Sequence, residues 1–233
     1  MQKKLWISHG VSGWRIEMFF FDLDGTLLDS THVWIDIDTA FLGRHGISPV
    51  PPDYTDYVSH HSAPESARYT KERYQLSDSP EQIMDAWAEM AKTAYSQTLQ
   101  LKPGVREFLQ RCRQMNIRMG ILTSCFPHLC HAALKHHGLS HLFEVVLTTN
   151  ETGLEKGDGG LYRLALETCQ VRPQDCTLFE DSPGYCAAAK QVGFHVVGLQ
   201  DRMFASRQEE LKALCGPGRY LTDFTSVIPE DFL

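Results

Sequence analysis

The chain has 233 residues, of which 42% are hydrophobic and 22% charged, and its formal net charge is −7. This composition excludes a disordered chain, and the length suits one domain with a large insertion or a core with a small second module. The acidic balance disfavours nucleic acid as a partner. Because no apolar run reaches about 18 residues, no membrane span is predicted either.

The first 17 residues are predicted to be an N-terminal extension. Ser8-His9-Gly10 and Ser12-Gly13 interrupt any continuous apolar stretch of the kind that a signal peptide needs. Met18 stands directly before the first predicted strand and is a candidate start of translation. From Met18 to Leu23 the sequence is an apolar run of strand length, which Asp24-Gly25-Thr26 ends with a turn signal.

Residues 30–101 interrupt the expected alternation of strands and helices. Helical spacing occurs at residues 33–45, 63–74 and 80–98, and a proline-rich separator occupies residues 48–53. We therefore predict a helical cap, inserted into the chain and lying above the sheet.

The rest of the chain alternates in a regular way. Helices are predicted at 104–115, 127–137, 161–169, 183–192 and 205–214, and strands at 117–123, 143–147, 176–179, 195–199 and 219–221. Repeated β-α order predicts an α/β fold, a doubly wound parallel sheet with helices on both faces. This Rossmann-like core is expected to consist of residues 18–29 and 102–233.

Four of the predicted strand ends carry polar groups, and in an open α/β sheet ligands bind at the carboxyl ends of the strands. The groups are Asp22-Leu23-Asp24-Gly25-Thr26, Thr123-Ser124, the region of Lys156, and Glu180-Asp181-Ser182. Together they offer hard oxygen ligands for Mg²⁺, hydroxyl and amide donors for an oxyanion, and one cation.

These motifs resemble those of the haloacid dehalogenase-like superfamily, in the helical-cap branch of β-phosphoglucomutase and phosphoglycolate phosphatase. Asp22–Thr26 matches its first motif D-x-D-G-T, Gly120–Ser124 its second, Lys156 its third and Phe179–Gly193 its fourth. The chain departs from the family pattern after Lys156, where Gly157-Asp158-Gly159-Gly160 replaces the usual Pro-x-Pro-Asp.

The resemblance implies a phosphatase in which Asp22 attacks phosphorus and Asp24 is the general acid and base. It implies that Mg²⁺ is held by Asp22, the backbone carbonyl of Asp24, Asp181 and, as a helper, Glu180. The phosphoryl group would be bound by Gly25, Thr123, Ser124 and Lys156. The expected substrate is a small phosphorylated metabolite, and the expected protein is a cytoplasmic monomer.

Four alternatives compete with hydrolysis of a phosphate ester. One is a phosphonate hydrolase of this superfamily, which would use a cap lysine as a Schiff base and departs from this chain at the position of Asp24. Dehalogenases of this superfamily usually lack a carboxylate at the position of Asp24. Sugar-phosphate mutases need a second anion site in the cap and commonly place an Arg where Pro64 stands, although Arg68, Lys71 or Arg73 could compensate. A non-catalytic binding module with the same fold is the alternative from another class.

The cysteines of the chain and its Cys- and His-rich segment have no assigned role in this scheme. Seven scattered cysteines, an odd number without a C-x-x-C pair, favour free thiols in a reducing compartment. The Cys- and His-rich residues 125–137 do not match a usual zinc-site spacing.

The candidate substrate contacts in the cap are His32, Trp34, Asp36, His60, His61 and Arg68.

Overall fold

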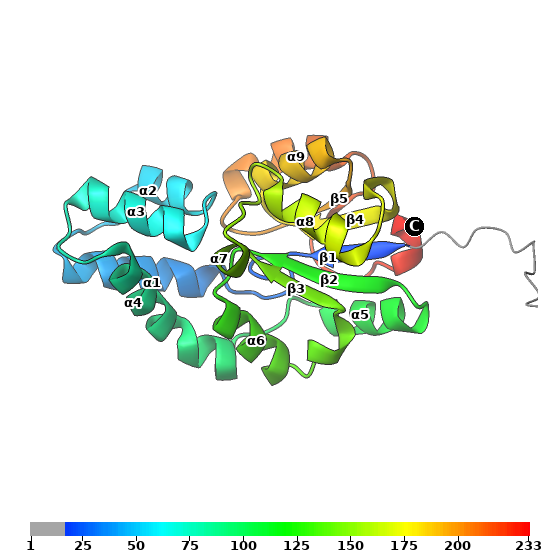
Figure 1. Ribbon diagram of the computed structural model, residues 1–233, viewed down its shortest axis with the longest axis horizontal. Helices are drawn as coiled ribbons and strands as arrows, with labels where there is room; N and C mark the ends of the chain where they lie inside the picture. Colours follow the sequence, from blue (N-terminus) through cyan, green and yellow to red (C-terminus); the bar gives the residue numbers. More distant parts are fainter. Residues whose placement is uncertain (1–16) are drawn as a thin grey trace, which may run out of the picture.

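The computed structural model describes residues 17–233, so residues 1–16 of the predicted extension lie outside the described part. Within it the chain forms a six-stranded parallel sheet in the order β3-β2-β1-β4-β5-β6, between two layers of helices (Figure 1). The predicted α/β class is confirmed. No helix of this part is long and apolar enough to cross a membrane.

The strands follow the apolar runs of the sequence. They are β1 (Met18–Phe21), β2 (Arg118–Thr123), β3 (Val145–Thr148), β4 (Cys176–Glu180), β5 (His195–Leu199) and β6 (Tyr220–Leu221). The first strand, MFFF, is entirely apolar because it pairs with β2 and β4 and is covered by helices on both faces. Its carboxyl end therefore opens at the middle of the sheet.

Side chains of β1 alternate between two hydrophobic cores. Phe19 and Phe21 belong to the core under α5 and α6, whereas Met18 and Phe20 belong to the core under α8, α9 and α10. These helices are α5 (Val105–Gln114), α6 (Pro127–His136), α8 (Gly160–Cys169), α9 (Pro183–Val192) and α10 (Gln208–Cys215). Stacking of Phe21 on Phe179, with ring centroids 4.7 Å apart, fixes the ends of β1 and β4 beside each other.

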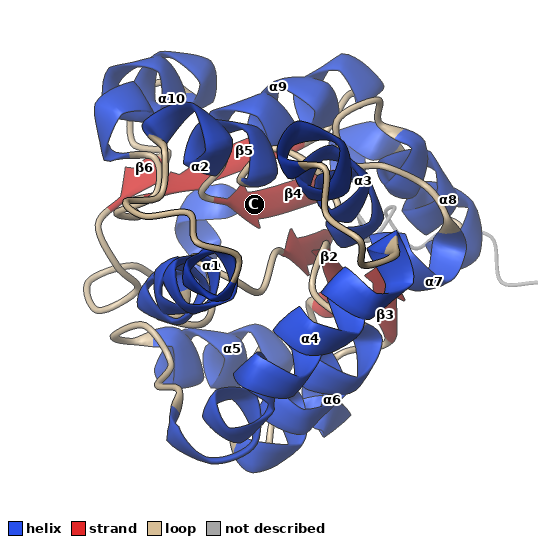
Figure 2. Ribbon diagram, turned by 90° about the vertical axis from the view of Figure 1, so that its left-hand side faces the viewer, coloured by secondary structure: helices blue, strands red, loops and turns tan. Residues whose placement is uncertain are grey.

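The inserted segment is helical and lies at the carboxyl ends of the strands (Figures 1 and 2). It contains α1 (Thr31–Arg44), α2 (Pro52–Val58), α3 (Ala63–Tyr74), α4 (Pro80–Thr93) and a π-helical turn, η1 (Ala94–Thr98). Helix α4 begins with a capping box, in which Ser79 and Gln82 bond each other's backbone amides, and it packs against α1 and α3.

Most element boundaries lie within two residues of the sequence-based prediction, and the differences that matter for the fold are these. Helix α2 starts inside the predicted separator because Pro52 suits the first turn of a helix. The helix expected at 80–98 changes to π geometry at Ala94, the one at 205–214 begins with a 3₁₀ turn, and β3 starts at Val145. The short helix α7 (Thr149–Thr152) was not predicted.

The insertion leaves and rejoins the sheet region through two chain segments that lie side by side. Leu28 and Leu101 form an antiparallel bridge, the Asp29 amide donates to the Gln100 carbonyl at 3.0 Å, and the Lys102 amide donates to the carbonyl of residue 27 at 2.9 Å. At the other side of the insertion, the Ser62 hydroxyl donates to Glu155 Oε1 at 2.6 Å. These contacts hold the helices over the strand ends.

Candidate active site

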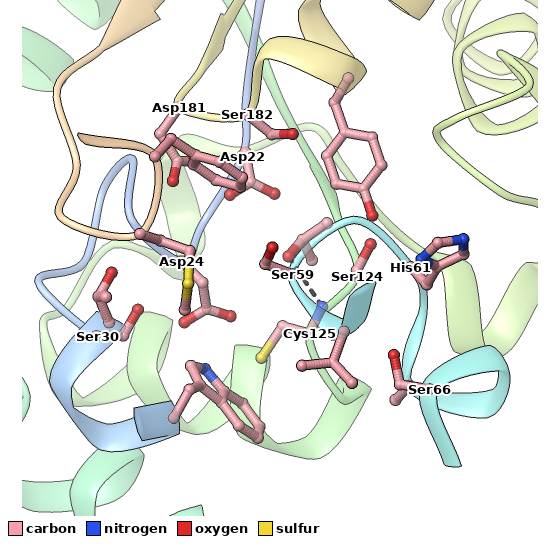
Figure 3. A pocket seen from close by; sticks show the side chains of 18 of the residues that line it. Asp22, Asp24, Ser30, Ser59, His61, Ser66, Ser124, Cys125, Asp181 and Ser182 are labelled. Carbon is pink, nitrogen blue, oxygen red and sulfur yellow. Dashed lines mark hydrogen bonds between the residues drawn. The ribbon is translucent and has the colours of Figure 1, made fainter. Parts of the chain in front are cut away.

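A cavity of about 190 Å³ lies between the carboxyl ends of β1, β2 and β4 and the inserted helices (Figure 3). Asp22 and Asp24 line it from the turn after β1, Thr123 and Ser124 from β2, and the pair Glu180-Asp181 from β4. The parallel sheet therefore brings together side chains up to 159 residues apart, as the Asp22–Asp181 separation shows. Lys156 and Gly25 lie behind this wall.

Lys156 is fully buried and links two carboxylates. Its Nζ donates to Asp22 Oδ1 at 2.7 Å and to Glu180 Oε2 at 2.5 Å. Burial alone would lower the pKa of Lys156, but the negative charges of Asp22 and Glu180 more than offset it and raise that pKa well above its ordinary value. The lysine is therefore a permanent cation against Asp22, even though its loop lacks the family's two prolines.

Glu180 is held at both carboxylate oxygens. Oε2 accepts from Lys156, and Oε1 accepts from the backbone amides of Asp181 and Ser182 at 3.1 and 3.0 Å, at the start of α9. Amides at a helix N-terminus suit a carboxylate because they have no partner within the helix. Glu180 thus braces Lys156 and the turn that carries Asp181.

Three carboxylates form a group that could hold a metal ion. Asp22, Glu180 and Asp181 each offer one oxygen, and these atoms lie within 4.8 Å of one another. Hard oxygen donors of this kind fit Mg²⁺. Burial, opposed by Lys156 and reinforced by Glu180, raises the pKa of Asp22 to about 7, and burial together with the charges of Glu180 and Asp22 raises the pKa of Asp181 well above its usual range. A bound cation would offset this clustering of like charges.

Residue 25 must be glycine because two chain segments lie close together at this point. Its φ is +78°, and a Cβ at this position would lie 2.3 Å from Asp181 Oδ2. The next residue, Thr26, donates its hydroxyl to Asp181 Oδ1 at 3.1 Å. The Gly-Thr pair of the first motif therefore seats the Asp181 carboxylate against the turn after β1.

Asp24 has partners of a different kind from those of Asp22. The Tyr95 hydroxyl donates to Asp24 Oδ1, and Trp34 Nε1 donates to the Tyr95 oxygen at 2.8 Å. Burial raises the pKa of Asp24, and hydrogen bonds from neutral groups, Tyr95 first, oppose that rise. Among residues 17–233, the hydrogen-bond partners of this carboxyl group are neutral donors rather than a cation.

The end of β2 offers a hydroxyl at the cavity wall. Thr123 is 1% exposed, and its Oγ1 accepts from the Cys125 amide at 3.1 Å (Figure 3). Accepting this bond leaves the hydroxyl hydrogen free to donate to a ligand oxygen. Ser124 lines the cavity beside it.

The candidate contacts from the insertion divide into two groups. Trp34 and His61 line the cavity. The other four lie outside its lining: His32 and Asp36 are exposed on α1, Arg68 pairs with Glu65, and His60 contacts Arg207.

Two residues of the site are missing from the sequence-based prediction: Tyr95, which bonds Asp24 but does not line the cavity, and Asp38, which does. Tyr95 lies on the π turn, and a single tyrosine at the end of a helix carries no signal for a catalytic partner. Asp38 lines the cavity from α1, four residues after Trp34 and therefore on the same helix face. That spacing was the available signal, but it becomes informative only once Trp34 is known to face the strand ends.

The zinc hypothesis finds no support in residues 17–233. The group of Asp22, Glu180 and Asp181 is the one metal-binding cluster found there, and no Cys or His of residues 125–137 belongs to it. The seven cysteines are free and buried. Cys125 and Cys130 pack around the site as small apolar side chains.

Acidic groups at the carboxyl ends of a parallel sheet, under an inserted helical layer, define a hydrolase-type site. A family model described as haloacid dehalogenase-like hydrolase matches residues 19–199, and the chain belongs to this family. It is 28% identical to validoxylamine A 7′-phosphate phosphatase of Streptomyces hygroscopicus subsp. limoneus, over 89% of this chain and 93% of that protein.

A second relative agrees with this assignment, and a solved structure shares the fold. The phosphorylated carbohydrates phosphatase of Thermotoga maritima is 27% identical, over 76% of this chain and 82% of its own length. CbbY of Rhodobacter sphaeroides, crystallised with phosphate, superposes with a TM-score of 0.77 at 20% identity, covering 91% of this chain and 96% of that one. The predicted enzyme class, a phosphatase-type hydrolase of this family, is confirmed.

Proposed function

We propose that the chain is a Mg²⁺-dependent phosphatase that hydrolyses a small phosphorylated carbohydrate or related metabolite through an aspartyl-phosphate on Asp22. One observation carries the proposal. Asp22 and Asp24 line the same cavity, yet Asp22 is paired with a buried cation and Asp24 only with neutral donors. Two carboxyl groups whose surroundings differ in this way suit different roles, one as an anion and one as an acid.

Asp22 is the proposed nucleophile. The ion pair with Lys156 favours its carboxylate form, and the same lysine lies close enough to offset negative charge as a phosphoryl oxygen approaches. The Thr123 hydroxyl and the Ser124 amide are proposed to bind the other phosphoryl oxygens. When bound by Asp22, Asp181, the Asp24 carbonyl and, as a helper, Glu180, Mg²⁺ would reduce the repulsion between carboxylate and phosphate.

Asp24 is the proposed general acid and base. Its raised pKa lets it give a proton to the leaving oxygen, after which it takes one from the water that hydrolyses the aspartyl-phosphate. Tyr95 and Trp34 belong to the inserted segment, so the acid is oriented by the layer that covers the cavity. The inserted helices would exclude bulk water during the reaction.

The lining of the cavity favours hydrolysis over a mutase reaction. A mutase must bind a second phosphate, but no Lys or Arg lines the cavity in the described chain. The cap cations that could compensate for Pro64 have other partners: Arg68 pairs with Glu65, Lys71 donates to the carbonyls of Leu76 and Asp78, and Arg73 pairs with Asp53.

The test is to incubate the purified full chain with p-nitrophenyl phosphate and with hexose 1-phosphates, with and without Mg²⁺. We expect Mg²⁺-dependent release of inorganic phosphate and inhibition by beryllofluoride, a mimic of the phosphoryl group. No phosphate release from any ester would contradict the proposal, and rapid formation of a 6-phosphate isomer with little free phosphate would favour the mutase.

A further inference from the structure

One face of helix α1 forms a wall of the cavity. Thr31, Trp34 and Asp38 line it at spacings of three and four residues, which place them on one helix face. Asp36 and Ile35 lie on the exposed side of the same helix. Because an α-helix rises 1.5 Å per residue, Asp38 lies about 10 Å along the axis from Thr31, away from the strand ends.

Asp38 is a carboxylate without a protein partner. It makes no hydrogen bond or ion pair with any other residue of 17–233, although it is half-buried. Burial raises the pKa of Asp38 to about 7, and its charge contributes to the raised pKa of Tyr54, whose hydroxyl bonds Thr70 instead. An unpaired acceptor at a cavity wall would gain a partner only when a ligand brings a donor.

The remaining walls repel anions. Five carboxylates line the cavity, namely Asp22, Asp24, Asp38, Glu180 and Asp181, and the lining described includes His61 but neither Lys nor Arg. Between Asp38 and the strand ends, the walls are largely apolar and include Trp34, Trp87, Phe126 and Phe204. Such walls suit the C–H faces of a sugar or cyclitol, whereas a carboxylate or a second phosphate would face like charge without a counter-ion.

We propose that the leaving group is a neutral or cationic polyol, of about six carbons, whose distal hydroxyl or ammonium group donates a hydrogen bond to Asp38. A second anionic group on the substrate is rejected by the same walls. This inference rests on the proposed phosphatase function and assigns its specificity to Asp38. The length follows from the two helical turns that separate Asp38 from the start of α1.

The first experiment compares wild-type kcat/KM for two esters with the same carbon skeleton. Sorbitol 6-phosphate ends in a hydroxymethyl group, and 6-phosphogluconate ends in a carboxylate. We expect 6-phosphogluconate to be at least ~30-fold poorer, because like charges facing each other in a closed cavity are strongly unfavourable. Equal rates would overturn the inference.

The second experiment tests Asp38 itself. In Asp38→Ala, kcat/KM for glucose 6-phosphate and glucosamine 6-phosphate should fall by ~10- to 100-fold more than for p-nitrophenyl phosphate, whose leaving group carries no hydrogen-bond donor for residue 38. Asp36→Ala, on the exposed side of α1, is the matched control and should not change these ratios. Loss ratios near one in Asp38→Ala would overturn the inference.

Asp38→Asn distinguishes a hydroxyl donor from an ammonium donor. Because asparagine keeps the shape of aspartate and one acceptor oxygen, this variant is also expected to fold if the alanine variant does not. If the donor is a hydroxyl, both substrates should stay within ~5-fold of wild type. If the donor is an ammonium group, glucosamine 6-phosphate should lose ~10-fold more than glucose 6-phosphate. Either pattern, together with the alanine result, supports the inference. Failure of the proposed function would show differently, as absence of phosphate release from the aryl ester by the wild type.

Discussion

The two ends of the cavity differ in the kind of side chain that lines them. At the strand ends, charged groups lie close together, and Lys156 pairs with both Asp22 and Glu180. At the end formed by the inserted helices, aromatic side chains surround a single unpaired carboxylate, Asp38. The first arrangement suits chemistry common to all substrates, because any phosphate ester brings the same group. The second suits selection, because only the leaving group reaches it.

The most severe test of this division is Asp22→Asn. An amide is neither a useful nucleophile nor an anionic ligand, so we expect kcat to fall by at least ~10⁴-fold for every ester, whatever its leaving group. Phosphate release from several substrates is the measurement, and thermal denaturation shows whether the variant is folded. Undiminished turnover on any of the esters would disprove the role of Asp22.

Removing the buried cation should have the next largest effect. Lys156→Met leaves Asp22 and Glu180 unpaired, so we expect a ~10²- to 10³-fold loss of kcat and a fall of about 3–5 kcal/mol in the free energy of unfolding. Urea denaturation and steady-state kinetics measure the two effects. Lys92→Met is the control, because its partner Glu89 is exposed and the pair should contribute less than about 1 kcal/mol. Similar effects in both variants would contradict the assigned importance of the buried lysine.

Tyr95→Phe tests the contact that joins the two ends. Without the hydroxyl, Asp24 loses its donor from the inserted segment, and proton delivery to the leaving oxygen should suffer. We expect kcat to fall ~10- to 50-fold for sugar phosphates but less than ~3-fold for p-nitrophenyl phosphate, whose leaving group needs little protonation.

The matched control for Tyr95→Phe is Tyr57→Phe. Tyr57 also belongs to the inserted helices, but its hydroxyl donates to Glu65, at 3.4 Å, and not to Asp24. This variant should behave as wild type on both esters. An equal loss on both esters in Tyr95→Phe would indicate a structural role for Tyr95 rather than orientation of the acid.

A smaller effect is expected in the pH dependence of stability. Burial raises the pKa of Asp22 from 3.8 to about 7, so the metal-free folded state binds protons more tightly than the unfolded state, and stability falls as pH rises from about 4 through 7. Mg²⁺ needs the deprotonated carboxylates, so the increase in Tm that it produces should be a few degrees larger at pH 8 than at pH 5.5.

Thermal denaturation with and without Mg²⁺ measures this difference, and Asp181→Asn serves as the control. The variant lacks one anionic ligand, so its response to Mg²⁺ should be weak at both pH values. If the wild type gains the same Tm at pH 5.5 and pH 8, the carboxylate group is not where Mg²⁺ binds.

The contrast between the two ends also explains how far the sequence could be interpreted. The strand-end residues follow short apolar runs, and parallel strands bring their carboxyl ends to one edge, so the positions of Asp22, Thr123, Lys156 and Asp181 could be predicted. Their roles stay predictions. The order of the strands was not predicted, because the rule that consecutive β-α units pack side by side fails between β3 and β4, which are separated by β2 and β1.

The cavity wall on the inserted side could not be predicted in this way. Its residues come from helices whose facing depends on how they pack against one another, which local periodicity does not determine. Tyr95 reaches Asp24 because the chain widens into a π turn at Ala94, and nothing in the local sequence signals that change. The proline-rich start of α2 was wrongly assigned to a separator for a related reason, since Pro52 both ends loops and begins helices.

The paired chain segments at Leu28 and Leu101 have a mechanical consequence. Two backbone segments bonded side by side resist shear and independent twisting, so any movement of the inserted helices relative to the sheet would pivot about this pair. Asp24 lies four residues before Leu28, and Tyr95 six residues before Leu101. The hydrogen bond between Tyr95 and Asp24 thus lies close to this pivot and would move little. Ser62 and Glu155, on the far side of the insertion, would separate the most. Substrate could therefore enter and product leave while Asp24 keeps nearly the same position relative to Tyr95.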